Sequence, residues 1–274
     1  MNENRPPYSL KAPGSPSSGS PRHLPGRGSF PDVDDHLVQP EITRDEIIGG
    51  QRVVLSPAHE PHATQHTELD YVVRAHVAPG YGAATDLLTR HDEESDFASD
   101  TCVRKKGVDP ETSGRYLEEI AFEVVSEQNE RYVTEKALRM HRRGVRRIFT
   151  VWVKGPWRVC EWSPESQSWR PLEAGAQIED PCLVTPLAVA ALLDAAAADN
   201  AVVEALAAKG NPEIQRREAV VEAEAILKVL EARGIAVSVD QRQEILSCQD
   251  RDRLDQWLRR AVLASSAGEV ISEP

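Results

Sequence analysis

The chain has 274 residues, enough for one large or two small domains, and its 40% hydrophobic content is enough for a folded core. A mean hydropathy of -0.44 and 19 prolines indicate that part of the chain stays unfolded. The net charge of -12 opposes binding of the whole protein to nucleic acid or anionic membranes, so a phosphate-binding surface must be a local basic patch.

The cysteines and the apolar stretches indicate the cellular compartment of the protein. The four cysteines form no Cys-x-x-Cys pair, which argues against a zinc motif or a dense disulfide framework and fits a reducing compartment. The N-terminus lacks the apolar core of a signal peptide. The most apolar stretch, residues 183–208, includes Asp194 and Asp199 and is too polar to cross a membrane. We therefore expect a cytoplasmic protein with no membrane partner.

Residues 1–40 hold eight of the prolines, with Ser and Gly between them and few apolar residues. Such a segment cannot bury enough surface to offset the entropy of ordering it. We predict a disordered leader there. A peptide ligand for a partner is the alternative to a plain tail.

Residues 44–106 predict a hairpin, a helix and two strands. DEIIGGQRVVLS gives two short strands around Gly49-Gly50, a dipeptide that allows the positive φ of tight turns. The stretch PHATQHTELDYVVRAHV has apolar residues at helical spacing. AATDLLTRH and DFASDTCVRKK follow as two strands.

The stretch from Leu117 to Val153 has the most informative pattern in the chain. It predicts an apolar strand (IAFEVV), an amphipathic helix (YVTEKALRMHRR) and a second apolar strand (IFTVWV). Glu123 interrupts the first strand, and a buried carboxylate is costly unless it is paired or binds a cation. Lys136 lies in the helix that follows.

The rest of the chain predicts a meander followed by helices. WRVCEW and QSWRPL continue the sheet as antiparallel strands, and their tryptophans are interpreted as core and cross-strand pairs, with a base-stacking platform as the alternative. From Pro186 the sequence is helical and rich in Ala. Its apolar stripes predict a helical appendage packed on itself, with a partner helix or coiled-coil dimer as the alternative.

The residues that could carry chemistry are two carboxylates and a lysine. Asp100 and Glu123 lie on successive predicted strands, so they could meet at one sheet edge and bind Mg²⁺. Lys136 could reach the same place and orient a water for phosphodiester hydrolysis. The plainer alternative is that Asp100 caps a turn, Glu123 pairs with an arginine and Lys136 is solvated.

Several short motifs together resemble the Uma (DUF820-like) family of restriction endonucleases, in the PD-(D/E)XK nuclease superfamily. They are Ser99-Asp100, the run EVVS from Glu123, Lys136 in KALRMHRRGV, and the apolar strand after Gly144-Val145. The hairpin DEIIGGQ, the segment SPAHEPHATQH and the end GAQIEDPCLVTPLAVAALLD are also similar to the family. The resemblance covers roughly residues 44–194. Here Ser99 replaces the usual Pro, and SEQN and FTVW replace the usual Ser-Pro-Ser and Tyr-Trp.

The resemblance implies a metal-dependent endonuclease. Asp100 and Glu123 would hold Mg²⁺ or Mn²⁺, with Glu46 as a possible third carboxylate. Lys136 would be the catalytic lysine, displaced from the strand onto the helix because Val125 occupies the usual lysine position. The substrate would be nucleic acid, with DNA expected before RNA.

Two further groups of residues have open interpretations. The arginines at the helix end could grip phosphates or could complement the helix dipole, worth about 0.3–1 kcal/mol each; they are Arg139, Arg142, Arg143, Arg146 and Arg147. His62 and His66 are four residues apart, but the sequence offers no third ligand at zinc spacing, so we do not expect a metal site on them.

The expected architecture is α/β: a PD-(D/E)XK-like mixed sheet flanked by helices over residues 41–194, with an α-helical appendage over 195–274. The appendage is similar to the helical tails of Rpn-type transposase-associated nucleases. A homodimer, or a protein partner of the helices, is possible. The alternative function is a degenerate nuclease fold that acts as a binding or scaffold module.

Overall fold

The computed structural model describes residues 30–39, 45–54, 59–126 and 128–272. They belong to two compact units, a larger one ending at Ala205 and a smaller one starting at Leu206. This division lies later than the boundary expected at residue 194. Residues 1–29 of the expected leader lie outside the described residues.

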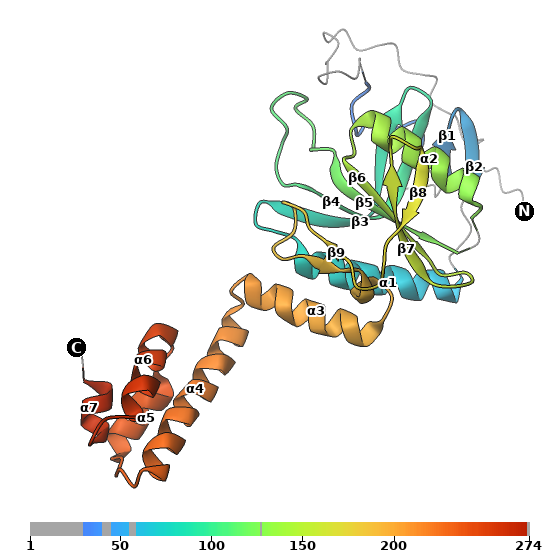
Figure 1. Ribbon diagram of the computed structural model, residues 1–274. Coiled ribbons are helices and arrows are strands. Elements are labelled where there is room, and N and C mark those ends of the chain that lie inside the picture. Colours follow the sequence, from blue (N-terminus) through green and yellow to red (C-terminus); the bar gives the residue numbers. More distant parts are fainter. Residues whose placement is uncertain (1–29, 40–44, 55–58, 127, 273–274) are drawn as a thin grey trace, which may run out of the picture. The chain divides into compact units, whose positions relative to one another are not determined.

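The larger unit consists of one main sheet and its flanking helices (Figure 1). Its main strands are β1 (Asp45–Ile48), β2 (Gln51–Val54), β3 (Tyr81–Asp92), β4 (Ser95–Lys105), β5 (Glu118–Val125), β6 (Arg147–Trp152), β7 (Arg158–Ser163) and β8 (Ser168–Pro171). A small second sheet pairs β9 (Gln177–Ile178) with β10 (Leu187–Ala188). The helices are α1 (Glu60–His76), α2 (Glu130–Arg143), the 3-10 turn η1 (Val189–Leu192) and α3 (Ala195–Ala208), which runs into the smaller unit.

The sheet is mixed, as the sequence predicts. Its order is β2-β1-β4-β5-β6-β7-β8, with β3 also paired to β4. β5 and β6 are parallel and are joined by α2, whereas β6, β7 and β8 form the expected antiparallel meander. The α/β class, with a mixed sheet flanked by helices and a helical C-terminal region, is confirmed.

One edge of β4 is shared by two strands, β1 and β5. We call the stretch of β4 between their pairings, residues 98–100, the fork. β3 pairs with β4 from Tyr81↔Lys105 to Asp92↔Ser95 and so occupies one edge. On the other edge β1 pairs at Asp96, and β5 pairs from Thr101 onward. Between these pairings, residues 98–100 of β4 have no strand partner on that edge within the described sheet. Backbone groups that point to this edge must therefore bond to side chains or to water.

Two helices cover the sheet, α1 along one face and α2 along the other (Figure 1). In α1 the residues at helical spacing are buried, among them Leu69, Val72 and Val73. α2 begins where the Asn129 side chain accepts a hydrogen bond from the Tyr132 amide, and it ends at Gly144, whose φ of 133° suits glycine. This cap and this stop fix which α2 residues face the sheet.

The tryptophans are mostly structural, as expected. Trp162 and Trp169 face each other across β7 and β8 with ring centroids 5.2 Å apart, and Trp152 is buried. Trp157 differs, because it is 49% exposed in the turn before β7.

Residues 30–39 pack against the sheet, although the sequence placed them in the leader. Val33 and Val38 are buried. The amides of Leu37 and Val38 donate to the buried carboxylate of Asp96, over 2.8 and 3.2 Å. This segment has no periodic pattern, so its attachment cannot be read from residue spacing.

The smaller unit is helical and has its own core. Its helices are α4 (Pro212–Ala232), α5 (Val239–Ser247), α6 (Arg251–Ala261) and α7 (Ala267–Ile271). Trp257, Ile226 and Leu230 are buried together with residues from each of these helices. This agrees with the appendage packed on itself. Among the described residues, none of the helices has the length and apolar character needed to cross a bilayer.

Candidate functional site

Glu123 lies on β5 beside the fork and is 6% exposed. One of its oxygens, Oε2, accepts a hydrogen bond from the Lys136 ammonium at 2.8 Å. The other oxygen, Oε1, is buried and has no hydrogen-bond partner among the described residues. A buried carboxylate oxygen without a donor is costly, and a bound cation is one way to satisfy it.

Lys136 reaches the fork from α2 and is 4% exposed. Besides Glu123, its ammonium donates to the Ala98 carbonyl at 2.8 Å and lies 3.5 Å from Glu46 Oε1. Burial alone would lower the pKa of Lys136, but the carboxylates of Glu123 and Glu46 raise it overall. The lysine therefore stays charged, and it is not solvated as the plainer interpretation supposed.

Glu46 comes from β1 and has a partner for each oxygen. Its Oε1 accepts from the Ala98 amide at 3.0 Å, and its Oε2 accepts from the Tyr132 hydroxyl at 2.6 Å. Together Glu46 and Lys136 satisfy both backbone groups of Ala98 on the open edge of β4. We call Lys136, Glu123, Glu46 and Tyr132 the lysine cluster. The structure uses Glu46 to hold this cluster, and it does not bring Glu46, Asp100 and Glu123 together as three ligands.

Burial raises the pKa of Glu123 to about 8, with Lys136 acting against the shift and Asp100 and Glu46 adding to it. Two buried carboxylates beside one lysine, with the partly exposed Asp100 near them, leave an excess of negative charge. A proton on Glu123 relieves this excess, and a divalent cation would relieve it more fully. The electrostatics of the site therefore favour a cation beside Glu123.

Asp100 lies on β4 at the far end of the fork. The pairing of Thr101 with Phe122, continued by one residue, sets Asp100 beside Glu123. Asp100 Oδ2 accepts a hydrogen bond from the Val124 amide at 2.6 Å. Asp100 and Lys136 both act electrostatically on Glu123, so the three side chains lie near one another. Their roles as metal ligands and catalytic lysine stay predictions.

The backbone of β4 is irregular at Asp100. Ser99 contacts Met140 of α2, whereas Thr101 donates to Asp70 of α1. Residues two apart on a regular strand share a face, so β4 changes face between them. On the neighbouring strand the residue facing this point is Asp86, which has a φ of 49°. The irregularity lets Asp100 reach toward β5 and α1 together.

The arginines expected to grip phosphate are mostly engaged with the protein itself. Arg139 pairs with Asp92 at 2.6 Å and with Glu135 at 3.1 Å. Arg143 is buried, donates to the Pro31 carbonyl and lies over the Phe30 ring. Burial lowers the pKa of Arg143 to about 10.

The two arginines after α2 are also paired. Arg146 contacts Asp180 at 2.7 Å, and Arg147 contacts Glu161 at 2.7 Å. Arg142 differs, because it is exposed and forms no ion pair with the described residues. A phosphate would have to compete with carboxylates for most of this cluster, so its role in binding nucleic acid stays a prediction.

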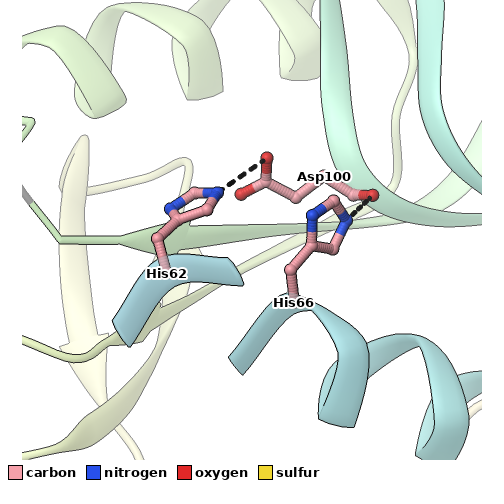
Figure 2. Close-up of side chains that lie close together, drawn as sticks. All are labelled: His62, His66 and Asp100. Carbon is pink, nitrogen blue, oxygen red and sulfur yellow. Dashed lines mark hydrogen bonds and ion pairs between the residues drawn. The ribbon is translucent and has the colours of Figure 1, made fainter. Parts of the chain in front are cut away.

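A second cluster lies on the α1 side of Asp100. His62, His66 and Asp100 each offer a ligand atom, and these atoms lie within 4.8 Å of one another. Figure 2 shows both histidines rising from α1 toward Asp100. We call these three residues the histidine cluster. The sequence analysis recognised the two histidines but found no third ligand; the structure supplies Asp100, because β4 runs past α1.

Similarity to known proteins is found among solved structures. No protein-family model matches the chain, and no curated protein matches it. Among solved structures it is similar to a protein from Anabaena variabilis ATCC 29413, described as a "putative nuclease belonging to DUF820". The identity is 18% and the TM-score 0.45, over 54% of this chain and 88% of that one. The likeness of the C-terminal helices to Rpn-type tails stays an expectation.

Proposed function

We propose that the chain is a metal-dependent nuclease that hydrolyses phosphodiester bonds of DNA with Mg²⁺ or Mn²⁺. The observation that carries the proposal is the geometry at the fork. A buried Lys136 ammonium lies 2.8 Å from Glu123, whose second oxygen has no partner among the described residues. Asp100 interacts electrostatically with Glu123, and its Oδ2 accepts a hydrogen bond from the amide of Val124, the residue after Glu123.

The residues present suit a divalent cation. Asp100 and Glu123 would hold it through oxygen atoms, which Mg²⁺ and Mn²⁺ prefer. When bound, the cation would supply positive charge against the charge that develops on a phosphate during hydrolysis. Glu123 must release its proton for this role, and its raised pKa makes that release dependent on pH.

Lys136 would act next to the reacting atoms. Its ammonium is held by Glu123 and Ala98 in one position, so it can orient a water or a phosphate oxygen without a loss of side-chain freedom. Its raised pKa keeps it charged near neutral pH, so it serves as a positive group rather than as a base.

The test is cleavage of supercoiled plasmid and of single-stranded RNA by the purified full chain, with Mg²⁺, Mn²⁺ or EDTA. Glu123→Gln and Asp100→Asn keep the side-chain shapes while removing charge. Both are expected to lower the cleavage rate by at least about a hundredfold, a loss typical for removal of a catalytic group. Glu130→Gln, at the exposed start of α2, is the matched control and should cleave like the unchanged protein.

Circular dichroism and thermal unfolding would show that each variant is folded. Cleavage that persists in EDTA, or that is equal in Glu123→Gln and the unchanged protein, would contradict the proposal. So would the absence of cleavage with either substrate by a folded protein. RNA cleavage without DNA cleavage would retain the mechanism and correct the substrate.

The lysine cluster also favours a second candidate, a degenerate nuclease fold that acts as a scaffold. Lys136 donates to two acceptors and forms an ion pair with Glu46, and Glu46 has both oxygens bonded, so most of the cluster is satisfied without a ligand. If this candidate holds, the cluster serves the stability of the fork. Plasmid and RNA would remain intact, and Mg²⁺ would leave the unfolding temperature of the protein unchanged.

A further inference from the structure

We propose that the histidine cluster, His62, His66 and Asp100, is a binding site for a first-row transition-metal dication, with Zn²⁺ as the probe ion. It shares Asp100 with the proposed nuclease site, but it lies on the other side of that residue and its ion-binding does not depend on cleavage. The sequence spacing of His62 and His66, four residues apart on one helix, places both rings on the same face of α1.

The distances need little change to hold an ion. His62 Nε2 lies 3.8 Å from Asp100 Oδ1, and all three candidate ligand atoms lie within 4.8 Å of one another. Ligands at about 2.0–2.2 Å from a tetrahedral Zn²⁺ are roughly 3.3 Å apart. The side chains therefore need to close by an ångström or so, which rotation about their χ angles can supply.

Existing hydrogen bonds leave suitable atoms free to bind. His66 Nε2 lies 2.6 Å from the Asp100 carbonyl, and because a carbonyl only accepts, this nitrogen must be the donor. The other ring nitrogen, Nδ1, is then a lone-pair donor for a metal, and Figure 2 shows it on the side of His62 and the Asp100 carboxylate. Metal-binding histidines commonly donate their second N–H to a carbonyl in this way.

The Asp100 carboxylate also has one atom held by a hydrogen bond and one atom available to an ion. The Val124 amide donates to Asp100 Oδ2 at 2.6 Å, while Oδ1 is the oxygen nearer to His62. One oxygen thus fixes the orientation of the carboxylate and the other is presented to the histidines. Fixed ligands lose less freedom when an ion binds.

The surroundings of the cluster are acidic. Asp70 Oδ2 lies 3.9 Å from His66 Nε2, and Asp70 is itself held by the hydroxyls of Thr85 and Thr101. Asp86, beside Asp100 on β3, interacts electrostatically with His62, His66, Asp70 and Asp100. This excess of negative charge attracts a dication.

The ligand types favour a transition metal over Mg²⁺. Imidazole nitrogen suits Zn²⁺, Co²⁺ and Ni²⁺, whereas Mg²⁺ prefers oxygen ligands and keeps its waters. The side chains of His62, His66 and Asp100 are 13%, 15% and 18% exposed, so an ion can enter from solvent. Three protein ligands leave a fourth position for water or a substrate oxygen.

The test is calorimetric titration of the metal-free, full-length, untagged chain with Zn²⁺ in a large excess of Mg²⁺. We expect one Zn²⁺ per chain at micromolar affinity or tighter, and a rise in the unfolding temperature because Zn²⁺ binds the folded state. His62→Ala and His66→Ala should each weaken binding at least about tenfold. His59→Ala, an exposed histidine at the start of α1, should bind like the unchanged protein.

Co²⁺ gives an independent readout, because His62→Ala should remove the visible absorption of four-coordinate Co²⁺ that the unchanged chain displays. Glu123→Gln separates the two proposals, since it should abolish cleavage but retain Zn²⁺ binding. The inference is overturned if the folded chain fails to bind Zn²⁺ stoichiometrically, if both histidine variants bind as well as the unchanged chain, or if Mg²⁺ displaces Zn²⁺.

Discussion

Two clusters meet around Asp100, and they differ in how their charge is balanced. The lysine cluster is almost fully buried and contains its own cation, Lys136, between two carboxylates. The histidine cluster is partly open to solvent, and its members are surrounded by further acids. In the lysine cluster most polar atoms are bonded within the protein. The histidine cluster has an excess of negative charge that a cation from solvent would balance.

This difference in burial and charge balance distinguishes residues that hold the structure of a site from residues that can bind and release a ligand. Buried ionic groups hold one arrangement because breaking it strands a charge in a medium with few dipoles. Imidazoles and carboxylates that reach solvent can bind and release an ion at little structural cost. Asp100 belongs to both environments, because β4 changes face at that residue.

The largest effect is expected from Lys136→Met, which breaks the lysine cluster. It leaves Glu123 and Glu46 buried without their cation, so the free energy of unfolding should fall by about 3–5 kcal/mol. Chemical denaturation measures it. Lys105→Met is the matched control, because Lys105 is half exposed and lies 3.7 Å from Glu119; it should cost less than about 1 kcal/mol. Equal losses in the two variants would refute the contrast.

The pH dependence of stability sharpens the same comparison. The pKa of Glu123 is raised from 4.5 to about 8 in the folded protein, so between these values the folded chain holds a proton that the unfolded chain has released. The free energy of unfolding should therefore fall as pH rises through this window. Urea titrations at several pH values should show a smaller fall in Glu123→Gln. An identical pH dependence in the two proteins would contradict the raised pKa.

A moderate effect is expected from Tyr132→Phe, which removes one hydroxyl from the lysine cluster. The hydroxyl donates to Glu46 at 2.6 Å, and loss of a hydrogen bond to a charged group costs about 1.5–3 kcal/mol. Tyr71→Phe is the control, because its hydroxyl donates to Asp199 at 3.2 Å on the surface. Its unfolding free energy should change by less than about 0.5 kcal/mol.

The smallest effect on stability is expected from Arg142→Ala at the exposed end of α2, within about 0.5 kcal/mol. If this helix end contacts phosphate, DNA affinity should fall and its dependence on log salt should decrease by about one. Filter binding in Ca²⁺ measures both. Arg170→Ala, an exposed arginine on β8 that pairs with Glu161, should leave DNA affinity unchanged. A larger loss in Arg170→Ala would place the DNA contact elsewhere.

Much of the fold could be predicted from residue spacing. The apolar runs around Glu123 and Phe149 are long enough to identify β5 and β6, and the period of α2 places Lys136 on its buried face. Glu123 stood out because it is charged where the pattern demands an apolar side chain. These signals come from neighbouring residues, so they can be read from a single sequence without knowledge of tertiary contacts.

The rest depends on contacts between distant segments. The hydrogen bond from the Ala98 amide to Glu46 follows from β1 and β5 sharing one edge of β4. The pairing of Asp100 with the histidines depends on the packing of α1 against β4 and on the irregular strand at Asp100. The spacing of His62 and His66 was the available signal, but it could not name their partner.

The attachment of residues 30–39 has a practical consequence for anyone who shortens the chain. Asp96 is fully buried, and the donors to its Oδ2 are the amides of Leu37 and Val38. Burial already raises the pKa of this carboxyl. A recombinant fragment that starts at the hairpin would expose Asp96 to solvent or leave it without these donors, so the minimal domain for crystallisation or assay should start before Phe30.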